Sequence, residues 1–197
     1  MHVLEWKCHP CHLRLDISKL QTNLNVFILT CGEFEHPTLG GNCYFVMLID
    51  DMSGMIWVCP LKHKADFVDW FFKMDAIFLN QYKRHVGTLW MDNGGEYVNQ
   101  WLQDYCSWHG ILLKLTVPHT PQQNGVTERA NWMLTECMHA MMKDTDCPMT
   151  LWGEAVCTAA YCLNCMPTSA NSGITPFQAF KGIILSGHAW DWEHAMS

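Results

Sequence analysis

Arginine is scarce in this sequence, and a long apolar run is absent. Arg occurs at three of 197 positions, and acidic residues outnumber Lys and Arg by 19 to 12, for a formal net charge of −7. This charge has the wrong sign for a dedicated DNA-binding protein, because phosphate neutralisation needs Lys and Arg. No run of about 18 apolar residues occurs, which excludes a membrane-spanning helix. The first seven residues lack the apolar core of a secretory signal, so we expect an intracellular protein without a membrane partner.

Cysteine, histidine, tryptophan and methionine are abundant instead. The chain has 11 Cys, 11 His, 10 Trp and 13 Met. The cysteines do not have the regular spacing of a disulfide framework, so we expect reduced thiols. Apolar residues make up 49% of the chain, which excludes a disordered protein. The length is typical of one domain with its own core.

A Cys/His cluster lies near the N-terminus, at Cys8, Cys11 and His12. Two Cys separated by two residues and flanked by His could be half of a zinc site. The sequence offers no second ligand pair at a suitable distance, so the alternative is a loop with free thiols. A small Cys/His metal protein is a further hypothesis, and it depends on these residues alone.

Hydrophobic patterning predicts a mixed α/β domain. Three short β-rich segments separated by turns indicate an antiparallel meander over residues 26–30, 44–49 and 55–59. Apolar residues at three- and four-residue spacing predict a helix over 65–82. A polar loop is expected over 118–125, and the remaining patterns predict strands over 86–91 and 111–117 and helices over 99–108, 126–143 and 151–164. This order predicts one mixed sheet with helices on its faces.

Two acids stand out by their positions in this pattern. Asp92 follows a predicted strand just before a Gly pair, and Glu128 lies in the first turn of a predicted helix after a Gly. Strand ends and helix starts on one rim of an α/β sheet are where ligands gather. Carboxylates at such a rim bind hard divalent cations such as Mg²⁺. The alternative is that Glu128 only stabilises the helix dipole and that Asp92 caps a turn.

Several strings of the sequence resemble one protein family. Met91-Asp-Asn-Gly-Gly-Glu-Tyr97 and the segment Thr116–Asn131 resemble two motifs of the integrases of copia-type retrotransposons. Further strings similar to that family lie at Leu39–Val46, Ile49–Asp51, Pro60–Lys64, Leu151–Val156 and Thr175–Phe177. The resemblance covers residues 26–182.

The resemblance implies an integrase catalytic core over residues 26–182, with an RNase H-like α/β fold and a mixed five-stranded sheet. It also implies DNA integration by phosphoryl transfer, with two Mg²⁺ or Mn²⁺ ions held by three carboxylates. Asp92 would be the second of these catalytic, metal-binding acids and Glu128 the third. The implied partners are the DNA ends of the element, target DNA, RNA and further copies of the chain, in the nucleus.

The first acid of the family's site is missing. Its position, two residues before Cys31-Gly32, holds Leu29, and no Asp or Glu occurs between Asp16 and Glu33. Two carboxylates would leave much of the charge of two cations uncompensated, and an apolar side chain would lie against them. We therefore expect a degenerate and inactive integrase core. A non-catalytic module that binds nucleic acid or protein with the same fold is the alternative.

The two ends of the chain depart from the family. Residues 1–25 resemble a remnant of the zinc-binding segment that precedes the core in this family. His12 matches one of its His residues, whereas Lys7 replaces another and the downstream Cys pair is missing. Residues 183–197 resemble no part of the family and stay unassigned.

Loss of arginine offers an explanation for the composition. Where the family often has Arg, this chain has five other residues, namely Cys43, Trp90, Trp132, His139 and Cys165. Most Arg codons begin with CG, and deamination of methylated cytosine there yields codons for Trp, Cys, His or Gln. The alternative is an unusual composition that selection has kept.

We predict that the coding DNA carries the traces of such deamination. The codons of these five residues should each differ from an Arg codon by one C-to-T or G-to-A change, and intact related copies should have CG there. Sequencing the coding DNA and its relatives measures this directly. Relatives that encode Trp and Cys at the same positions would contradict the prediction.

Overall fold

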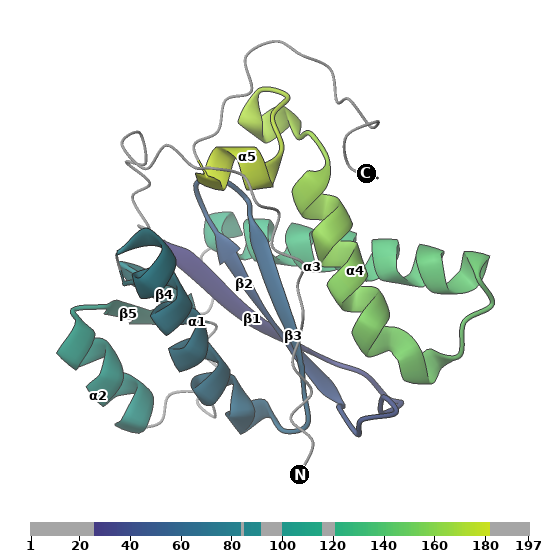
Figure 1. Cartoon of the computed structure of the whole chain (residues 1–197), viewed down its shortest axis with the longest axis horizontal. Helices are drawn as coiled ribbons and strands as arrows, with labels where there is room; N and C mark the ends of the chain where they lie inside the picture. The colour runs from purple at the N-terminus through teal and green to yellow at the C-terminus, as the bar shows by residue number, and fades with distance from the viewer. Residues whose placement is uncertain (1–25, 84, 92–99, 116–120, 182–197) are drawn as a thin grey trace.

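One five-stranded sheet organises the fold, with the strands in the order β3-β2-β1-β4-β5 (Figure 1). The structure is a computed structural model that describes residues 26–83, 85–91, 100–115 and 121–181. The predicted segments 1–25 and 183–197 lie outside the described residues, so the division of the chain into three parts stays a prediction.

The first three strands form the antiparallel meander that the sequence predicts, and the last two run parallel to the first. The predicted mixed sheet of five strands is therefore confirmed. The strands are β1 (Phe27–Glu33), β2 (Tyr44–Asp50), β3 (Ile56–Leu61), β4 (Thr88–Met91) and β5 (Leu112–Leu115).

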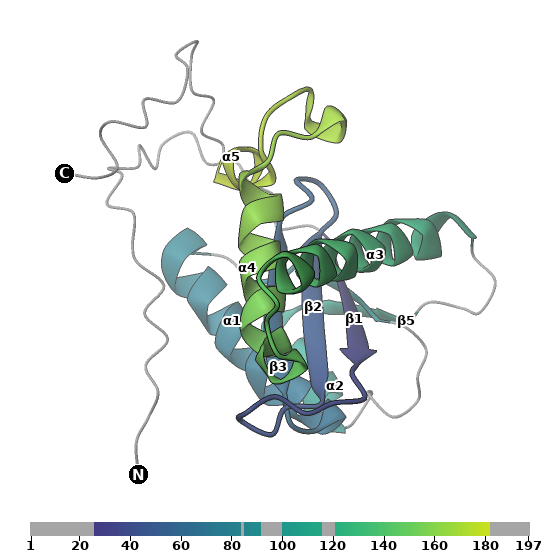
Figure 2. The ribbon, with the colours of Figure 1, turned by 90° about the vertical axis from the view of Figure 1, so that its right-hand side faces the viewer.

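Helices cover both faces of the sheet, as Figure 2 shows. Two of them, α1 (Phe67–Tyr82) and α2 (Gln100–His109), pack on one face, which we call the α1 face. The long α3 (Pro121–Asp144) and α4 (Trp152–Cys165) pack on the other, the α3 face. The short α5 (Pro176–Lys181) adds Phe180 to the core of the α1 face. None of the described helices is both long and apolar enough to cross a membrane.

The first half of β1 and all of β2 except its last residue are apolar, because the sheet is covered on both faces. Side chains alternate between the faces of a strand. In β1, Phe27 and Leu29 join the core of the α1 face, whereas Ile28 joins that of the α3 face. In β2, Leu48 and Ile49 divide in the same way. This two-sided burial explains the continuous apolar run that predicted a buried strand over 44–49.

Two strand ends differ from the prediction. β1 continues through Gly32 instead of stopping there, because Gly32 pairs with Phe45 and lies under its ring. A Cβ on Gly32 would be 2.0 Å from a ring carbon of Phe45, so only glycine fits at this place in the strand. Pro60 lies inside β3 instead of ending it, which is possible because β3 is an edge strand and needs fewer backbone donors.

The beginning of α3 also differs from the prediction. The helix begins at Pro121 instead of near Val126, so the second half of the predicted polar loop is helical. Proline suits the first position of a helix, because its missing N–H would be unpaired there in any case. The short α5 was not predicted, because its six residues are too few for a helical pattern to stand out.

Asn164 at the end of α4 fixes the edge strand β3. Its side-chain oxygen accepts a 2.9 Å hydrogen bond from the backbone N–H of Ile56, and its amide donates a 2.7 Å bond to the carbonyl oxygen of the same residue. The side chain is buried, so both bonds are shielded from water. One amide therefore replaces the strand partner that β3 lacks at its outer edge.

We predict that Asn164→Ala lowers the free energy of unfolding by about 2 kcal/mol, because it leaves a buried backbone donor and acceptor unpaired. Chemical denaturation of the purified chain measures this change. Thr158→Ala on the same helix is the matched control, because the exposed Thr158 hydroxyl donates only to the Glu154 carbonyl within α4. An equal effect of the two substitutions would show that the Asn164 bonds contribute no more to stability than an exposed hydroxyl.

Candidate functional site

The centre of the candidate site is the parallel pair of β1 and β4. Leu29 of β1 is paired with Met91, the last residue of β4. Asp92 follows Met91 in the sequence and lies outside the described residues. Leu29 is only 3% exposed and belongs to the apolar core of the α1 face. An apolar, buried side chain thus occupies the position where the resemblance implies the first acid.

Cys31 lies on the same face of β1, two residues beyond Leu29. Burial raises the pKa of its thiol to about 12, against a smaller opposing effect of Lys64. The thiol is therefore protonated at neutral pH. It does not supply the negative charge that a carboxylate in place of Leu29 would bring.

Glu128 lies on α3 and is exposed to solvent. It is not in the first turn of the helix as predicted, because α3 begins seven residues earlier at Pro121. The influence of a helix dipole falls off within the first turn, so the alternative that Glu128 only stabilises the dipole loses its basis. The predicted pairing of Asp92 with Glu128 involves a residue outside the described part, and it stays a prediction.

Two buried polar atoms have no hydrogen-bond partner among the described residues. One lies on β4, the strand before Asp92, and the other on α3, the helix that carries Glu128. They are Nε1 of Trp90 and Oδ1 of Asn131. Trp90 comes two residues before Asp92, and Asn131 comes three residues after Glu128. Unpaired buried groups cost stability. Among the described residues, hydrogen-bonding capacity is therefore left unused on the strand that precedes Asp92 and on the helix that carries Glu128.

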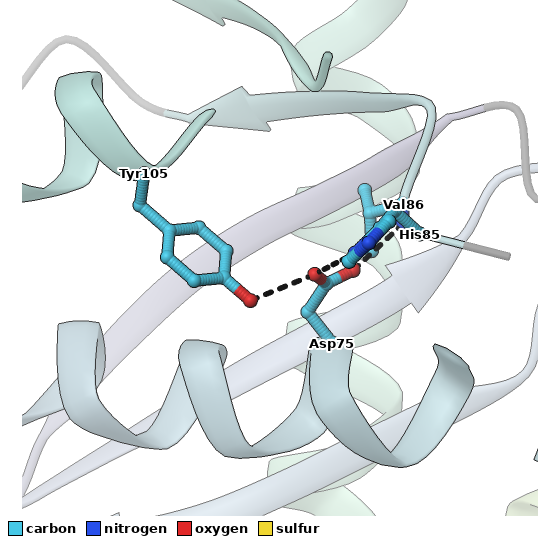
Figure 3. A network of polar contacts seen from close by, with 4 residues as sticks. All are labelled: Asp75, His85, Val86 and Tyr105. Carbon is cyan, nitrogen blue, oxygen red and sulfur yellow. Dashed lines mark hydrogen bonds and ion pairs between the residues drawn. The ribbon is translucent and has the colours of Figure 1, made fainter. Parts of the chain in front are cut away.

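A buried carboxylate on α1 holds the segment that leads into β4. Asp75 is fully buried and accepts three hydrogen bonds (Figure 3). The backbone N–H of Val86 donates to Oδ1 at 2.8 Å, and Tyr105 of α2 donates to Oδ2 at 2.9 Å. Nδ1 of His85 lies 2.5 Å from Oδ2. Asp75 thus ties α1 to α2 and to the residues before β4, the strand that runs toward Asp92.

The network around Asp75 also changes the ionisation of its neighbours. Burial, and then the hydrogen bond and negative charge of Asp75, raise the pKa of Tyr105 above its usual value. Burial and the same charge raise the pKa of the Cys106 thiol to about 11. This network was not predicted from the sequence. The signal that could have revealed it is a charged residue on the apolar stripe of α1, between Phe71 and Phe78 at helical spacing.

We predict that Asp75→Asn lowers the free energy of unfolding by about 2 kcal/mol or more, because an amide cannot accept all three bonds. Urea denaturation measures this loss. A second readout is the ultraviolet titration of tyrosine, in which the pKa of Tyr105 should fall toward its usual value once the negative charge is gone. Asp69→Asn, an exposed position in the first turn of the same helix, is the control: it should leave the tyrosine titration unchanged and lower the free energy of unfolding by less than about 1 kcal/mol, because only an interaction with the helix dipole is lost. An unchanged Tyr105 titration in Asp75→Asn would contradict the contribution of the Asp75 bond and charge to the raised pKa, and would leave burial as its cause.

The paired residues Leu29 of β1 and Met91 of β4 lie within a segment that matches a known protein family. The profile of the integrase core domain matches residues 29–121, which include both β1 and β4. The chain contains an integrase core domain. The prediction of an integrase core of a retrotransposon is thereby confirmed, as the curated relatives also indicate.

The relatives of this integrase core are retrovirus-related Pol polyproteins. That of transposon TNT 1-94 from Nicotiana tabacum is 43% identical over 143 residues, which are 73% of this chain and 11% of the relative. That of transposon RE2 from Arabidopsis thaliana is 35% identical over 139 residues, which are 71% of this chain and 9% of the relative. The chain therefore spans about a tenth of the length of these relatives.

A solved structure supports the fold. A chain in the structure of the simian T-cell lymphotropic virus intasome, in complex with PP2A regulatory subunit B56 gamma, matches with a TM-score of 0.63. The match covers 91% of this chain and 60% of that chain at 17% identity, so it bears on the fold alone. The RNase H-like α/β fold predicted for the integrase core is thereby confirmed.

Proposed function

We propose that this integrase core belongs to a retrotransposon Pol polyprotein, binds nucleic acid and does not catalyse DNA strand transfer. The observation that carries the proposal is Leu29, which is buried in the apolar core at the position of the first acid. Stabilisation of developing charge by positioned groups usually contributes more to catalysis than any other single effect. A centre without one of its three carboxylates loses much of that stabilisation.

The residues present do not fit a two-metal centre. Integrase core domains generally use divalent metals. The proposal assigns Asp92 and Glu128 as the remaining oxygen donors for Mg²⁺ or Mn²⁺, since Leu29 offers no oxygen. Among the described residues, no group of three or more His, Cys, Asp or Glu side chains could hold a metal ion.

The proposed partners follow from the relatives of the domain. We propose that the core contacts DNA, including element ends and target DNA, that it also binds RNA, and that it associates with further copies of itself in the nucleus. The support is general: the relatives are retrotransposon Pol polyproteins, and the similar solved chain comes from an intasome. The net charge of −7 argues for weak binding to phosphates.

A protein-interaction module is the second candidate function. The observation that favours it is the pair Trp101 and Trp108 on α2, whose side chains are 76% and 82% exposed. They are seven residues apart and so lie on one side of the helix. Large exposed aromatic side chains are typical of protein contact sites.

We predict that the unmodified chain joins a labelled element end to plasmid DNA at least about 100-fold more slowly than an intact relative, in Mg²⁺ or Mn²⁺. Removal of a carboxylate that positions cations takes away charge stabilisation where the reaction develops negative charge. A gel assay of joined products measures this rate. Robust joining by the unmodified chain that Asp92→Asn abolishes would show that another group replaces the missing acid.

The variant Leu29→Asp restores a carboxylate at position 29 and so tests whether its absence explains the predicted lack of strand transfer. It should lower the free energy of unfolding by about 3 kcal/mol or more without added metal, because it buries a carboxylate in an apolar core. Mn²⁺ should raise its thermal midpoint more than that of the matched variant Leu29→Asn, since only Asp adds an anionic ligand. Joining should recover in part only, because the chain has few Arg residues for DNA contacts. An equal response of the two variants to Mn²⁺ would contradict the assignment of this position to the metal site.

A further inference from the structure

The exposed side of α3 carries an aromatic side chain that the fold does not use. The side chain of Trp132 is 64% exposed, four residues after Glu128 and therefore on the same side of the helix. Within the described part of the chain, no ring or cation stacks on this indole. Several less exposed aromatic residues do have such partners: the rings of Phe34 and Trp152 are 4.4 Å apart, and those of Phe72 and Tyr105 are 4.0 Å apart.

The surroundings of Trp132 on α3 are mostly polar, although the adjacent Met133 is also exposed. Glu128, Arg129, Glu136 and His139 are all exposed on the neighbouring turns of α3. The hydroxyl of Thr135 donates to the carbonyl oxygens of Asn131 and Trp132 at 2.9 and 3.0 Å. An aromatic contact at the centre of a protein interface is usually enclosed by apolar neighbours. The ring of charged and polar side chains around Trp132 therefore favours a flat, polar partner over an apolar protein surface.

The local charge limits which part of a nucleic acid can bind here. Within one turn of Trp132 the negative Glu128 and Glu136 outnumber the positive Arg129. Attraction of phosphates is therefore weak at this point. Stacking of a base on an aromatic ring needs no net positive charge and tolerates any base, because every base has a π-face. An unpaired base has a face free for the indole, whereas the bases inside a duplex are stacked on both sides and only the terminal pair exposes a face.

We infer that Trp132 is a stacking site for an unpaired base of a single-stranded nucleic acid segment, on the helix that carries Glu128. The inference rests on the proposed function, because it assumes that this core binds nucleic acid. The ligand is a strand with unpaired bases. It binds α3 through one base, and the phosphates beside that base contribute less to the affinity. His139 and Lys143 lie farther along the exposed side of α3, where a continuing strand reaches them.

The exposed Trp residues of α2 provide a matched control. Trp101 and Trp108 are at least as exposed as Trp132. They lie on a helix that packs on the α1 face through Leu102 and Cys106, whereas α3 covers the opposite face of the sheet. If loss of any exposed indole weakened binding to nucleic acid, substitution of Trp101 would weaken it as much as substitution of Trp132. If Trp132 is the stacking site, only substitution of Trp132 weakens binding.

The experiment measures binding of the full chain to a short labelled oligodeoxynucleotide by fluorescence anisotropy. The oligonucleotide is used as a single strand, as a duplex with its complement, and as an abasic strand with the same number of phosphates. Trp132→Leu should weaken binding of the single strand about tenfold and leave the other two unchanged. Trp132→Phe should retain part of the binding, and Trp101→Leu should retain all of it. The melting temperatures of all variants serve as a check of folding.

The salt dependence separates stacking from phosphate contact. Trp132→Leu should leave the slope of log affinity against log salt concentration unchanged, whereas Arg129→Gln should reduce this slope by about 1 if Arg129 contacts a phosphate. Unchanged single-strand binding in Trp132→Leu would overturn the inference while nucleic-acid binding by the core stands. So would an equal loss with the abasic strand or the duplex, or an equal loss in Trp101→Leu. Absence of binding of the unmodified chain to all three probes would overturn the proposed function and this inference together.

Discussion

The parallel pairing of β1 with β4 is the constraint on which the rest of this fold depends. It joins the antiparallel meander to the second half of the sheet and sets Leu29 beside Met91. Both strands are covered on two sides, so their side chains are divided between the cores of the α1 face and the α3 face. Around this pair, Asp75 fixes the approach to β4 and Asn164 fixes the edge of β3. Each polar tie adds directional hydrogen bonds to a strand whose buried face already specifies its register.

In the same pair of strands, the residue at position 29 decides whether a charged or an apolar side chain is buried. A carboxylate on a central strand is tolerated only where charge and solvent compensate for its burial. Leu29 has no such need and joins the apolar core, so leucine at the position where the resemblance implies an acid fits the stability of the sheet. Nε1 of Trp90 and Oδ1 of Asn131, which have no hydrogen-bond partner among the described residues, are the opposite case, because buried unpaired groups cost stability. Function and stability therefore place opposite demands on neighbouring positions of this fold.

Much of the fold could be predicted because its elements follow simple periodicities. The apolar run of β2 and the three- and four-residue spacing in α1 each identify an element. Features that depend on distant contacts could not be predicted in this way. Gly32 stays in β1 because the ring of Phe45 covers it, and Asp75 is buried because donors from two other elements meet it. For the site, motif resemblance predicts Asp92 and Glu128, and this assignment stays a prediction. The position of Glu128 along α3 depended on where that helix begins.

The bond between Asn164 and Ile56 joins residues 108 positions apart in the chain. Trp152 likewise donates to the carbonyl oxygen of His36 across 116 positions, and Asn171 donates to that of Ser53 across 118. During synthesis the three-stranded meander is made first, but its edge and turns receive these partners only after α4 has left the ribosome. Contacts between such distant residues slow folding, because the chain must close a long loop before it gains them. The nascent chain therefore carries an incomplete sheet with an open edge until the last helices arrive, and during that interval it depends most on chaperones.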